Sequence, residues 1–332
     1  MPGTTMSVLI TGGAGYIGSH AVLAFREAGY PVVVIDDLST GHRGSVPPDV
    51  PFVLGSAGDS GLVSATLERY GIGAVVHFAG SCVVPESVHD PLKYYENNTC
   101  VSRALIEACA RHGVRGLLFS STAAVYGIPR SVPVSEDAET RPINPYGASK
   151  LAVEWILRDV SRSCEFRYAA LRYFNVAGAD PAGRTGQSTR AATHLIKIAS
   201  QAAAGVRASV TIHGADYATA DGTCVRDYIH VADLASAHVR VLARLLDGGP
   251  CTTLNCGYGR GYSVREVIDK VREVSGRDFE VAVGPRRAGD PDVLVADGSR
   301  IRQETGWQPR FDDLEVIVRT ALAWERRLAS GS

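Results

Sequence analysis

Short apolar runs that alternate with helical stripes mark the first part of the chain. Residues 8–10 form an apolar run that ends in a glycine-rich turn, and a helical stripe follows it. The apolar positions of that stripe are Ile17, Ala21, Phe25 and Ala28. Gly29 ends the stripe, and residues 32–35 form a second apolar run that reaches Asp36 and Asp37. The pattern predicts a strand, a tight turn, a helix and a second buried strand.

The same alternation continues as far as about residue 175. Apolar runs over residues 74–78, 116–120 and 168–172 predict further strands, and residues 94–111 read as a helix between the first two. Another helix, which carries Lys150, precedes the last of these strands. Near-continuous apolar strands that alternate with helices are typical of a parallel sheet covered on both faces. We therefore expect an α/β fold with a doubly wound parallel sheet of the Rossmann type.

The alternation weakens in the second half of the chain. Beyond Asn175 there are loops rich in Gly, Asp and Thr over residues 178–193 and 214–223. Helical patterns remain over residues 231–246 and 264–274. This change of pattern indicates a second lobe.

We expect the chain to divide into two unequal parts. The first domain would cover residues 1–178, and a smaller C-terminal α/β lobe would cover residues 179–332. Residues 252–255 resemble a strand that is able to return to the main sheet. In that case the first domain also receives a segment near residues 230–256.

Composition and charge narrow the class of protein. The chain has 332 residues, of which 45% are hydrophobic, so it is long enough to bury a sizeable core. Lys and Arg number 34 against 35 Asp and Glu, which leaves a net charge of -1. This balance argues against binding to nucleic acid or to a membrane surface and favours a small ligand.

Cysteine usage and the amino terminus suggest the compartment. The seven cysteines are odd in number and include no Cys-x-x-Cys pair, so we expect reduced thiols and no metal site. Residues 1–7 lack a charged region followed by an apolar run, and no stretch is long enough to span a bilayer. We expect a soluble, cytoplasmic protein.

Three glycines lie directly between the first strand and its helix. Gly12, Gly15 and Gly18 would let a pyrophosphate approach the backbone and the helix N-terminus. Asp36 follows at the end of the next strand, where a carboxylate accepts hydrogen bonds from an unmodified ribose and repels a 2′-phosphate. The motif predicts NAD in preference to NADP, although Asp36 is also suited to capping a turn.

Tyr146 and Lys150 have the spacing of a proton-transfer pair. On a helix the two side chains share a face, so the ammonium is able to stabilise a phenolate. Unit charges ~4 Å apart at an effective dielectric of ~20 interact by about 4 kcal/mol, or roughly 3 pKa units. The phenol would then be a base near neutral pH. Alone, the spacing also occurs by chance on surface helices.

Three hydroxyl residues end the strand over residues 116–120. Ser120, Ser121 and Thr122 lie at the carboxyl edge of the sheet, where such folds bind ligands. A run of this kind is often a solvated turn. Together with Tyr146, Lys150 and the glycine motif, it forms a set suited to alcohol–ketone interconversion with a nicotinamide.

These motifs resemble those of the extended short-chain dehydrogenase/reductase superfamily, and within it the UDP-glucose (UDP-galactose) 4-epimerase family. The resemblance covers about residues 7–325. The matching segments are TGGAGYIGSH (11–20), HFAG (77–80), YYENN (94–98), YGASK (146–150), LRYFN (171–175), DGTCVRDYIH (221–230) and PRRAGD (285–290).

The resemblance implies a reaction without net oxidation. NAD would stay bound while Tyr146 takes the proton from the sugar 4-hydroxyl and C4 gives a hydride to the nicotinamide. The 4-keto sugar would rotate about its diphosphate link and take the hydride back on its other face. Lys150 would lower the phenol pKa and hold the nicotinamide ribose, and Thr122 would bind the reacting oxygen.

The resemblance also implies the residues of both binding sites. Those expected at the cofactor are Gly12, Gly15, Tyr16, Ile17, Gly18, Asp36, Asp37, Phe78, Ala79, Gly80, Asn98, Ser120, Tyr146, Lys150 and Tyr173. Those expected at the UDP-sugar are Ser121, Thr122, Asn175, His194, Arg226, Arg287, Asp290 and Leu294. Guanidinium groups suit diphosphate oxygens through forked hydrogen bonds, although a single Arg often serves only solubility.

Several positions depart from the patterns of related enzymes. Relatives that dehydrate nucleotide sugars carry an acidic pair after the catalytic Thr, whereas Ala123 and Ala124 stand here, which favours epimerisation. Ser56 replaces an Asp that is directed at the adenine end of NAD, so NAD retention would be weaker. Cys82 stands where some members have a phosphate-binding Lys. Leu294 stands where members restricted to plain hexoses have Tyr, so N-acetylhexosamines would fit.

Other functions remain open at this stage. In one alternative, the chain would epimerise a UDP-N-acetylhexosamine or a UDP-pentose. In another, it would be a sugar-nucleotide reductase or dehydrogenase that exchanges its cofactor in each turnover. A protein that senses NAD without catalysis is a third class. By family resemblance we expect a homodimer, formed through residues 94–111 and the helix after Lys150.

Overall fold

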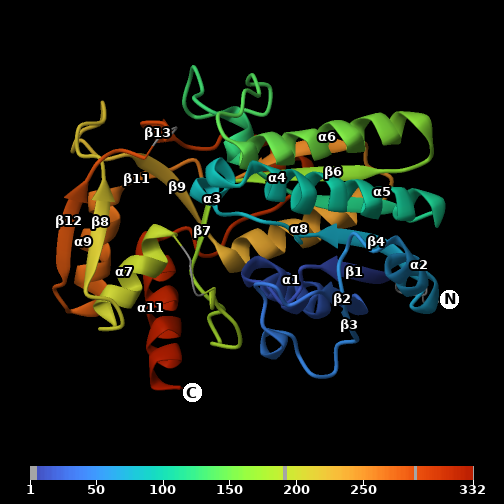
Figure 1. The fold of residues 1–332 in the computed structure, drawn as a ribbon, viewed down its shortest axis with the longest axis horizontal. Coiled ribbons are helices and arrows are strands. Elements are labelled where there is room, and N and C mark those ends of the chain that lie inside the picture. Colours follow the sequence, from blue (N-terminus) through green and yellow to red (C-terminus); the bar gives the residue numbers. More distant parts are fainter. Residues whose placement is uncertain (1–5, 190–192, 288–289, 332) are drawn as a thin grey trace.

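Seven parallel strands form the main sheet of this computed structural model, which describes residues 6–189, 193–287 and 290–331. The strands, in their spatial order, are β10 (Thr252–Cys256), β6 (Tyr168–Tyr173), β5 (Gly116–Thr122), β4 (Ile72–His77), β1 (Ser7–Thr11), β2 (Val32–Asp36) and β3 (Phe52–Leu54). The chain order reverses between β1 and β4, where open α/β sheets form a ligand crevice at their carboxyl edge. The expected doubly wound α/β fold is confirmed (Figure 1).

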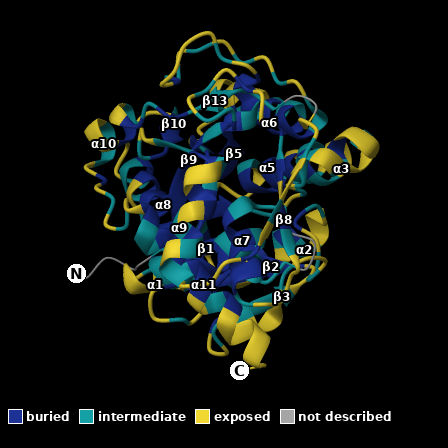
Figure 2. Ribbon diagram, turned by 90° about the vertical axis from the view of Figure 1, so that its left-hand side faces the viewer, coloured by how far each residue is buried: buried dark blue, intermediate teal, exposed yellow. Residues whose placement is uncertain are grey.

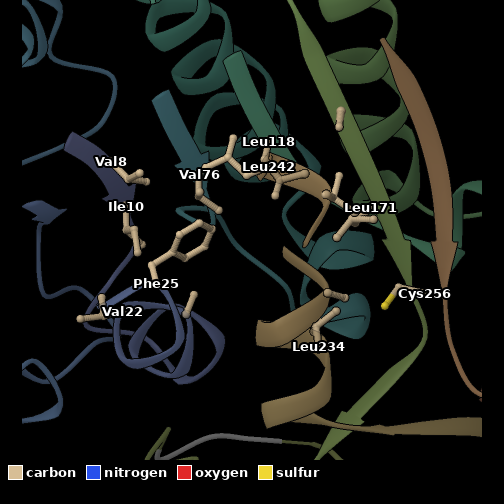
Figure 3. Close-up of a cluster of buried hydrophobic side chains, with 14 of the residues drawn as sticks. Val8, Ile10, Val22, Phe25, Val76, Leu118, Leu171, Leu234, Leu242 and Cys256 are labelled. Carbon is tan, nitrogen blue, oxygen red and sulfur yellow. The ribbon is translucent and has the colours of Figure 1, made fainter. Parts of the chain in front are cut away.

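Helices cover both faces of this sheet because successive residues of each strand point to opposite sides. In β1, Val8 and Ile10 pack in a cluster with Phe25 of α1 (Tyr16–Glu27). Leu242 of α8 (Val231–Leu246) belongs to the same cluster, as Figure 3 shows. Leu9 points the other way and packs with residues of the helices on the opposite face. Those helices are α2 (Ser60–Arg69), α5 (Val101–Arg111) and α6 (Pro145–Ser163).

A second lobe is built around β9 (Val225–His230). Its partners are β7 (Asn175–Ala177), β11 (Gly261–Ser263) and β13 (Val293–Leu294). A separate pair consists of β8 (Ser209–His213) and β12 (Glu280–Gly284). The helices α7 (Leu195–Ala203), α9 (Val264–Ser275) and α11 (Leu314–Ser330) enclose an apolar cluster with these strands. The last helix of the chain before α11 is α10 (Ser299–Thr305).

The chain crosses between the two parts more than once. β10 pairs with β6, so residues 252–256 do join the main sheet, and α8 packs against α1. The division at residue 178 stays a prediction. Figure 2 shows buried residues along β1, β5 and α8, with exposed residues on α3 (Val84–His89) and at the carboxyl end. Within the described ranges, no helix is both long and apolar enough to cross a membrane.

Two expectations about elements need correction. The helix expected over residues 94–111 is broken into α4 (Pro91–Tyr94), a π-helical turn η2 (Tyr95–Cys100) and α5. Ala28 is exposed beyond the end of α1, because Gly29 at φ 86° turns the chain out of the helix. The short edge strand β3 was not expected, since its three residues carry too little periodicity to be recognised.

Candidate active site

Close packing explains the glycines between β1 and α1. Gly12 has φ 69°, and a Cβ there would lie 2.6 Å from the backbone nitrogen of Ala79. A Cβ on Gly18 would lie 2.0 Å from the carbonyl oxygen of Gly12. α1 begins after Gly15 without a side-chain cap, so its first backbone N–H groups stay open to a ligand. The cradle fits an anionic pyrophosphate.

The first turn of α1 also contacts the second lobe. Tyr16 donates a hydrogen bond to the carbonyl oxygen of Gly178 at 2.6 Å. One turn later, the hydroxyl of Ser19 lies 2.8 Å from that of Thr185. Ile17 packs on the edge of the main core cluster. The loop that begins at residue 178 is therefore held against the helix that follows the glycine turn.

Asp36 caps a local turn, as the sequence allowed, and its role at the ribose stays a prediction. Its carboxylate accepts hydrogen bonds from the backbone nitrogens of Ala14 at 2.9 Å and Leu38 at 2.8 Å. The second bond caps the turn after β2, while the first ties the carboxylate to the glycine loop. Asp37 accepts a similar local bond from Ser39 at 2.9 Å. Burial raises the pKa of Asp36, and the two backbone hydrogen bonds oppose this rise.

Tyr146 stands in the first turn of α6, beside the end of β5. Asn144 caps this helix by accepting a hydrogen bond from Gly147 at 2.9 Å, and Pro145 follows it. Thr122, the last residue of β5, accepts a hydrogen bond from Ala124 at 3.1 Å. The Thr122 hydroxyl is also hydrogen-bonded to the Tyr146 phenol. The helix start and the strand end thus bring phenol and hydroxyl together.

Lys150 lies one turn further along α6 and is almost fully buried. Its ammonium donates a hydrogen bond to the carbonyl oxygen of Ser120 at 3.1 Å and lies 5.0 Å from the centre of the Phe119 ring. Burial lowers the pKa of Lys150 to about 8. The ammonium is held by the end of β5, close to the turn that contains Gly80.

In the protein chain alone, the pKa of Tyr146 is raised rather than brought near neutrality, and its lowering by Lys150 stays a prediction. Burial raises the pKa of Tyr146 well above its ordinary value, and the hydrogen bond with Thr122 opposes the rise. A phenolate loses its hydration in this site, while the Lys150 ammonium is directed to the Ser120 carbonyl. The phenol is therefore protonated in the chain by itself.

The hydroxyl residues of β5 point to opposite sides. The Ser120 hydroxyl is hydrogen-bonded to the Tyr173 phenol on the neighbouring strand. Ser121 is fully buried and donates to Glu154 at 2.5 Å, and Glu154 is paired with Arg172 at 2.6 Å. The expectation that Ser121 binds substrate is therefore corrected, because the alternation of the strand turns its side chain away from Thr122.

A turn after β4 lies beside the two catalytic elements. A Cβ on Gly80 would lie 2.7 Å from the amide oxygen of Asn98 and 3.5 Å from the Lys150 nitrogen. The Asn98 side chain accepts from the backbone nitrogen of Ser81 at 2.8 Å and donates to the Ser149 hydroxyl at 3.0 Å. Phe78 stacks on His238, 4.8 Å between ring centres. Phe78, Ala79 and Gly80 thus border the site that the glycine turn opens.

Four of the residues expected at the UDP-sugar lie on β9 or close to it. Arg226 is buried in β9 and forms an ion pair with Asp290. Leu294 pairs with Arg226 in the strand register, and Asn175 pairs with Tyr228. Leu294 also packs against the cluster that contains Ala123. This contact brings the second lobe next to the turn that follows Thr122.

Two further titratable groups feel the charge of Arg287. His194 lies 2.9 Å from the side-chain nitrogen of Gln187, and burial lowers its pKa, with the charges of Lys197 and Arg287 acting in the same direction. Burial and Arg287 also lower the pKa of His213, while Asp290 opposes this. His213 lies at the end of β8, and no motif in the sequence marks it. Residues 288 and 289 of the matching PRRAGD segment lie outside the described residues.

Known proteins match this chain over nearly its whole length. The model of the NAD dependent epimerase/dehydratase family matches residues 8–257. A UDP-glucose 4-epimerase of Azospirillum brasilense is 57% identical over 321 residues, which cover 97% of this chain and 92% of the relative. The crystal structure of UDP-glucose 4-epimerase from Brucella ovis in complex with NAD has a TM-score of 0.94 and 44% identity, and the match covers 97% and 98% of the two chains. The UDP-Glc/GlcNAc 4-epimerase of Campylobacter jejuni has a TM-score of 0.85 and 48% identity, with 97% and 99% covered.

Proposed function

The chain belongs to the NAD-dependent epimerase/dehydratase family, and from that premise we propose that it inverts C4 of a UDP-hexose, interconverting UDP-glucose and UDP-galactose. One observation carries the proposal. Tyr146, Thr122 and Lys150 converge where β5 ends and α6 begins, and the two residues after Thr122 are alanines. This set moves a proton at a sugar hydroxyl and offers no acid for the loss of water.

A bound NAD would supply reversible hydride transfer at C4 of the sugar, on either face of that carbon. The glycine turn would hold its pyrophosphate, since α1 begins after Gly15 without a side-chain cap on its first backbone N–H groups. Asp36 would bind the adenine ribose and discriminate against a 2′-phosphate. Lys150 of α6 reaches the backbone of Ser120 near the end of β5, and the two residues would hold the nicotinamide half there.

Tyr146 is the group that exchanges a proton with the sugar 4-hydroxyl. Its hydrogen bond with Thr122 places a second hydroxyl beside the reacting oxygen. Burial holds the phenol in its protonated form, so removal of its proton needs positive charge beside it. The Lys150 ammonium and the positive end of α6 supply part of that charge from the protein.

The absence of acids at Ala123 and Ala124 separates epimerisation from dehydration. Ala123 is buried in the 3-10 turn η3 (Ala123–Tyr126), next to Leu294. Elimination of a sugar hydroxyl requires a group that protonates the leaving oxygen. Neither alanine supplies one, so the 4-keto sugar is expected to be reduced again rather than dehydrated.

The UDP part is proposed to bind across β9 and the loops beside it. Arg226 presents a forked donor that Asp290 orients, and such a guanidinium suits diphosphate oxygens. Arg287 and His194 would add positive charge and a ring N–H on the same side. Asn175, at the start of β7, lies in register beside this strand.

Leu294 favours a wider substrate range that includes UDP-N-acetylhexosamines. The side chain is half-buried and packs against the apolar cluster that contains Ala123. A Leu fills less space than the Tyr expected in enzymes restricted to plain hexoses. The substrate range is tested by comparing wild type with the matched variant Leu294→Tyr. The panel contains UDP-glucose, UDP-galactose, their N-acetyl forms and UDP-pentoses. Unchanged selectivity in the variant would contradict the role of Leu294.

The main experiment uses the purified protein without added cofactor. We expect a bound nicotinamide nucleotide and interconversion of UDP-galactose with UDP-glucose without release of NADH. Stoichiometric release of NADH would show instead a sugar-nucleotide dehydrogenase. A protein that binds NAD but turns over none of the sugars in the panel would be a sensor.

We also propose a homodimer in the cytoplasm. α5 and α6 lie side by side on one face of the sheet (Figure 1), and Trp155 on α6 is 51% exposed. Tyr95 in the adjoining π-turn is 40% exposed. Exposed aromatic residues of this size are enriched at protein interfaces. All seven cysteines are free thiols, which supports a reducing compartment.

A further inference from the structure

A buried hydrogen-bond chain runs from the glycine-turn side of the sheet toward the helix that carries Tyr146. It is centred on His77, the last residue of β4, which is 1% exposed. The Thr11 hydroxyl at the end of β1 lies 2.6 Å from His77 Nδ1. His77 Nε2 lies 2.8 Å from the Ser102 hydroxyl on α5. Both ring nitrogens are therefore bonded, to elements on either side of β4.

Each hydrogen bond along this chain of side chains has one direction, from a defined donor to a defined acceptor. Ser102 donates its only hydroxyl proton to the carbonyl oxygen of Asn98, so it accepts a proton from His77 Nε2. A neutral imidazole has one N–H, so His77 Nδ1 accepts the proton of Thr11. Thr11 in turn accepts from the backbone nitrogen of Ala79 at 3.4 Å. Each hydroxyl has one donor and one acceptor, and no proton is shared between alternative partners.

The chain continues from Asn98 to the catalytic helix. The Asn98 amide nitrogen donates to the Ser149 hydroxyl at 3.0 Å, and Ser149 donates to the carbonyl oxygen of Tyr146 at 2.8 Å. The same amide accepts from the backbone nitrogen of Ser81 at 2.8 Å and donates to its carbonyl oxygen at 3.1 Å. Asn98 therefore joins the turn after β4 to the backbone of α6. The π-turn η2 contains Asn98, and such turns recur at functional sites.

We propose that His77 is a positioning residue for the proposed epimerisation, which holds Tyr146 in register with the glycine turn through Ser102, Asn98 and Ser149. The inference rests on the proposed function, because its effect is expressed in the transfer steps at the sugar. His77 touches neither Tyr146 nor the glycine loop through its own ring; it acts through Thr11 on one side and Ser102 on the other.

The environment of His77 suits a group that stays neutral. Burial lowers the pKa of His77 to about 3, and the nearby charge of Lys150 acts in the same direction. A single tautomer then persists across the working pH range, so the direction of the chain does not change. A charged imidazole would have two donors, and Thr11 would lose its acceptor.

Two substitutions at His77 each remove a different part of the hydrogen-bond chain. In His77→Asn, the short amide keeps an acceptor near Thr11 but does not reach Ser102. In His77→Gln, the longer amide nitrogen takes the place of Nε2 and keeps the donor to Ser102. We expect His77→Asn to lower kcat, per mole of bound NAD, by roughly tenfold to a hundredfold, as for a small displacement of a catalytic group. His77→Gln should recover most of this loss, and KM for the UDP-sugar should stay unchanged in both.

The first hydride-transfer step is also measured directly. Substrate is mixed with the holoenzyme, and the absorbance of reduced nicotinamide is followed with time. The step should slow in His77→Asn by the same factor as kcat. Ser149→Ala, which removes the last hydroxyl before Tyr146, should slow it in the same way if His77→Asn does not fold.

His230→Asn is the matched control. His230 is fully buried and also bonded on both ring nitrogens, to Ala232 at 3.1 Å and Thr320 at 3.1 Å, but it lies in the second lobe outside this chain. The His230→Asn variant should have a lower melting temperature than wild type but the same kcat per bound NAD. Equal kcat in wild type and His77→Asn, or equal losses in His77→Asn, His77→Gln and His230→Asn, would overturn the inference. A wild-type protein that does not epimerise any UDP-sugar would overturn the proposed function instead.

Discussion

At the scale of single residues, burial sets the protonation of the catalytic pair. It raises the pKa of Tyr146 and lowers that of Lys150 to about 8, so burial disfavours the charged form of both, but Lys150 keeps its positive charge at neutral pH. The spacing of the two residues on α6 was visible in the sequence, but their electrostatics were not. Positive charge from a bound nicotinamide would act on a phenol that the protein alone keeps protonated.

Tyr146→Phe should abolish most turnover without loss of bound NAD. The phenol is the group that we propose exchanges the sugar proton, and positioned acid–base catalysis contributes about 10² to 10⁴ in rate. The measurement is kcat for UDP-galactose together with the nicotinamide content of the purified variant. Turnover close to that of wild type would exclude Tyr146 as the proton-transfer group.

Asp36→Ala should weaken the preference for NAD over NADP. The carboxylate that would bind the ribose and repel a 2′-phosphate is lost, together with its bonds to Ala14 and Leu38. Affinities for both cofactors are compared in the apoprotein. Asp59→Ala, which removes the cap of α2, is the control for loss of a turn carboxylate. If both variants keep the wild-type ratio of affinities, Asp36 only caps its turn.

At the scale of elements, a buried ion pair ties α6 to β5 and β6. Arg172 and Glu154 lie 2.6 Å apart with both side chains buried, and Ser121 adds a donor to the same carboxylate. Arg172 also donates to the Tyr126 hydroxyl at 3.0 Å. The pair therefore fixes the helix that carries Tyr146 against the strand that ends in Thr122.

Removal of one partner should be strongly destabilising. We expect Arg172→Leu or Glu154→Leu to lower the free energy of unfolding by roughly 3–5 kcal/mol, since each leaves an unpaired buried charge. The double variant should lose less than the sum of the two. Denaturant unfolding of the three proteins measures this coupling. As a control, Arg130→Leu breaks the exposed pair with Glu139 and should lower the free energy of unfolding by less than about 1 kcal/mol. If the losses from the Glu154 and Arg172 substitutions add up in the double variant, the prediction is contradicted.

At the scale of the whole molecule, buried neutral histidines link stability to pH. Burial lowers the pKa of His77 and His230 to about 3, and that of His20 and His238 to about 4. The unfolded chain binds protons near its ordinary histidine pKa of about 6.5, before the folded chain does. Stability is therefore fully present above this value and is lost as the pH falls toward 4.

Unfolding by denaturant at pH 7 and pH 5 tests this linkage. Each such histidine is expected to lower the free energy of unfolding by up to about 1.4 kcal/mol for each unit by which the pH falls in this window. His238→Phe should reduce the loss, since His238 is fully buried and its Nε2 has no hydrogen-bond partner within the described residues. A free energy of unfolding that is equal at the two pH values would show that these histidines are charged or exposed.

The proposed homodimer gives a prediction for assembly. Trp155→Glu places a charge on the exposed face of α6 and should yield monomers, because a charged residue at the centre of an apolar interface is costly. Light scattering or sedimentation of the variant and of wild type gives the mass. Leu328→Glu, on the exposed side of α11, is the control, since Leu328 is exposed to a similar degree away from α5 and α6. A monomeric wild type would exclude the dimer.

The sequence by itself determined the features that depend on neighbouring residues. Apolar runs and glycine punctuation predicted six of the seven main strands, and α8 begins and ends where its periodicity indicated. The glycine turn and the Tyr146/Lys150 spacing are also local, so they were legible without a structure. Such signals arise within one or two turns of helix or one strand.

Only the tertiary structure decided the features that join distant segments. The Thr11–His77 contact spans 66 residues, Ser121 turned away from the site because of its place in β5, and burial raised the pKa of Tyr146 in the protein chain alone. Hydrogen-bond partners and desolvation depend on which elements pack together, and local periodicity does not encode that. The sequence thus determined which chemical groups are present, while packing determined where they point and which protons they carry.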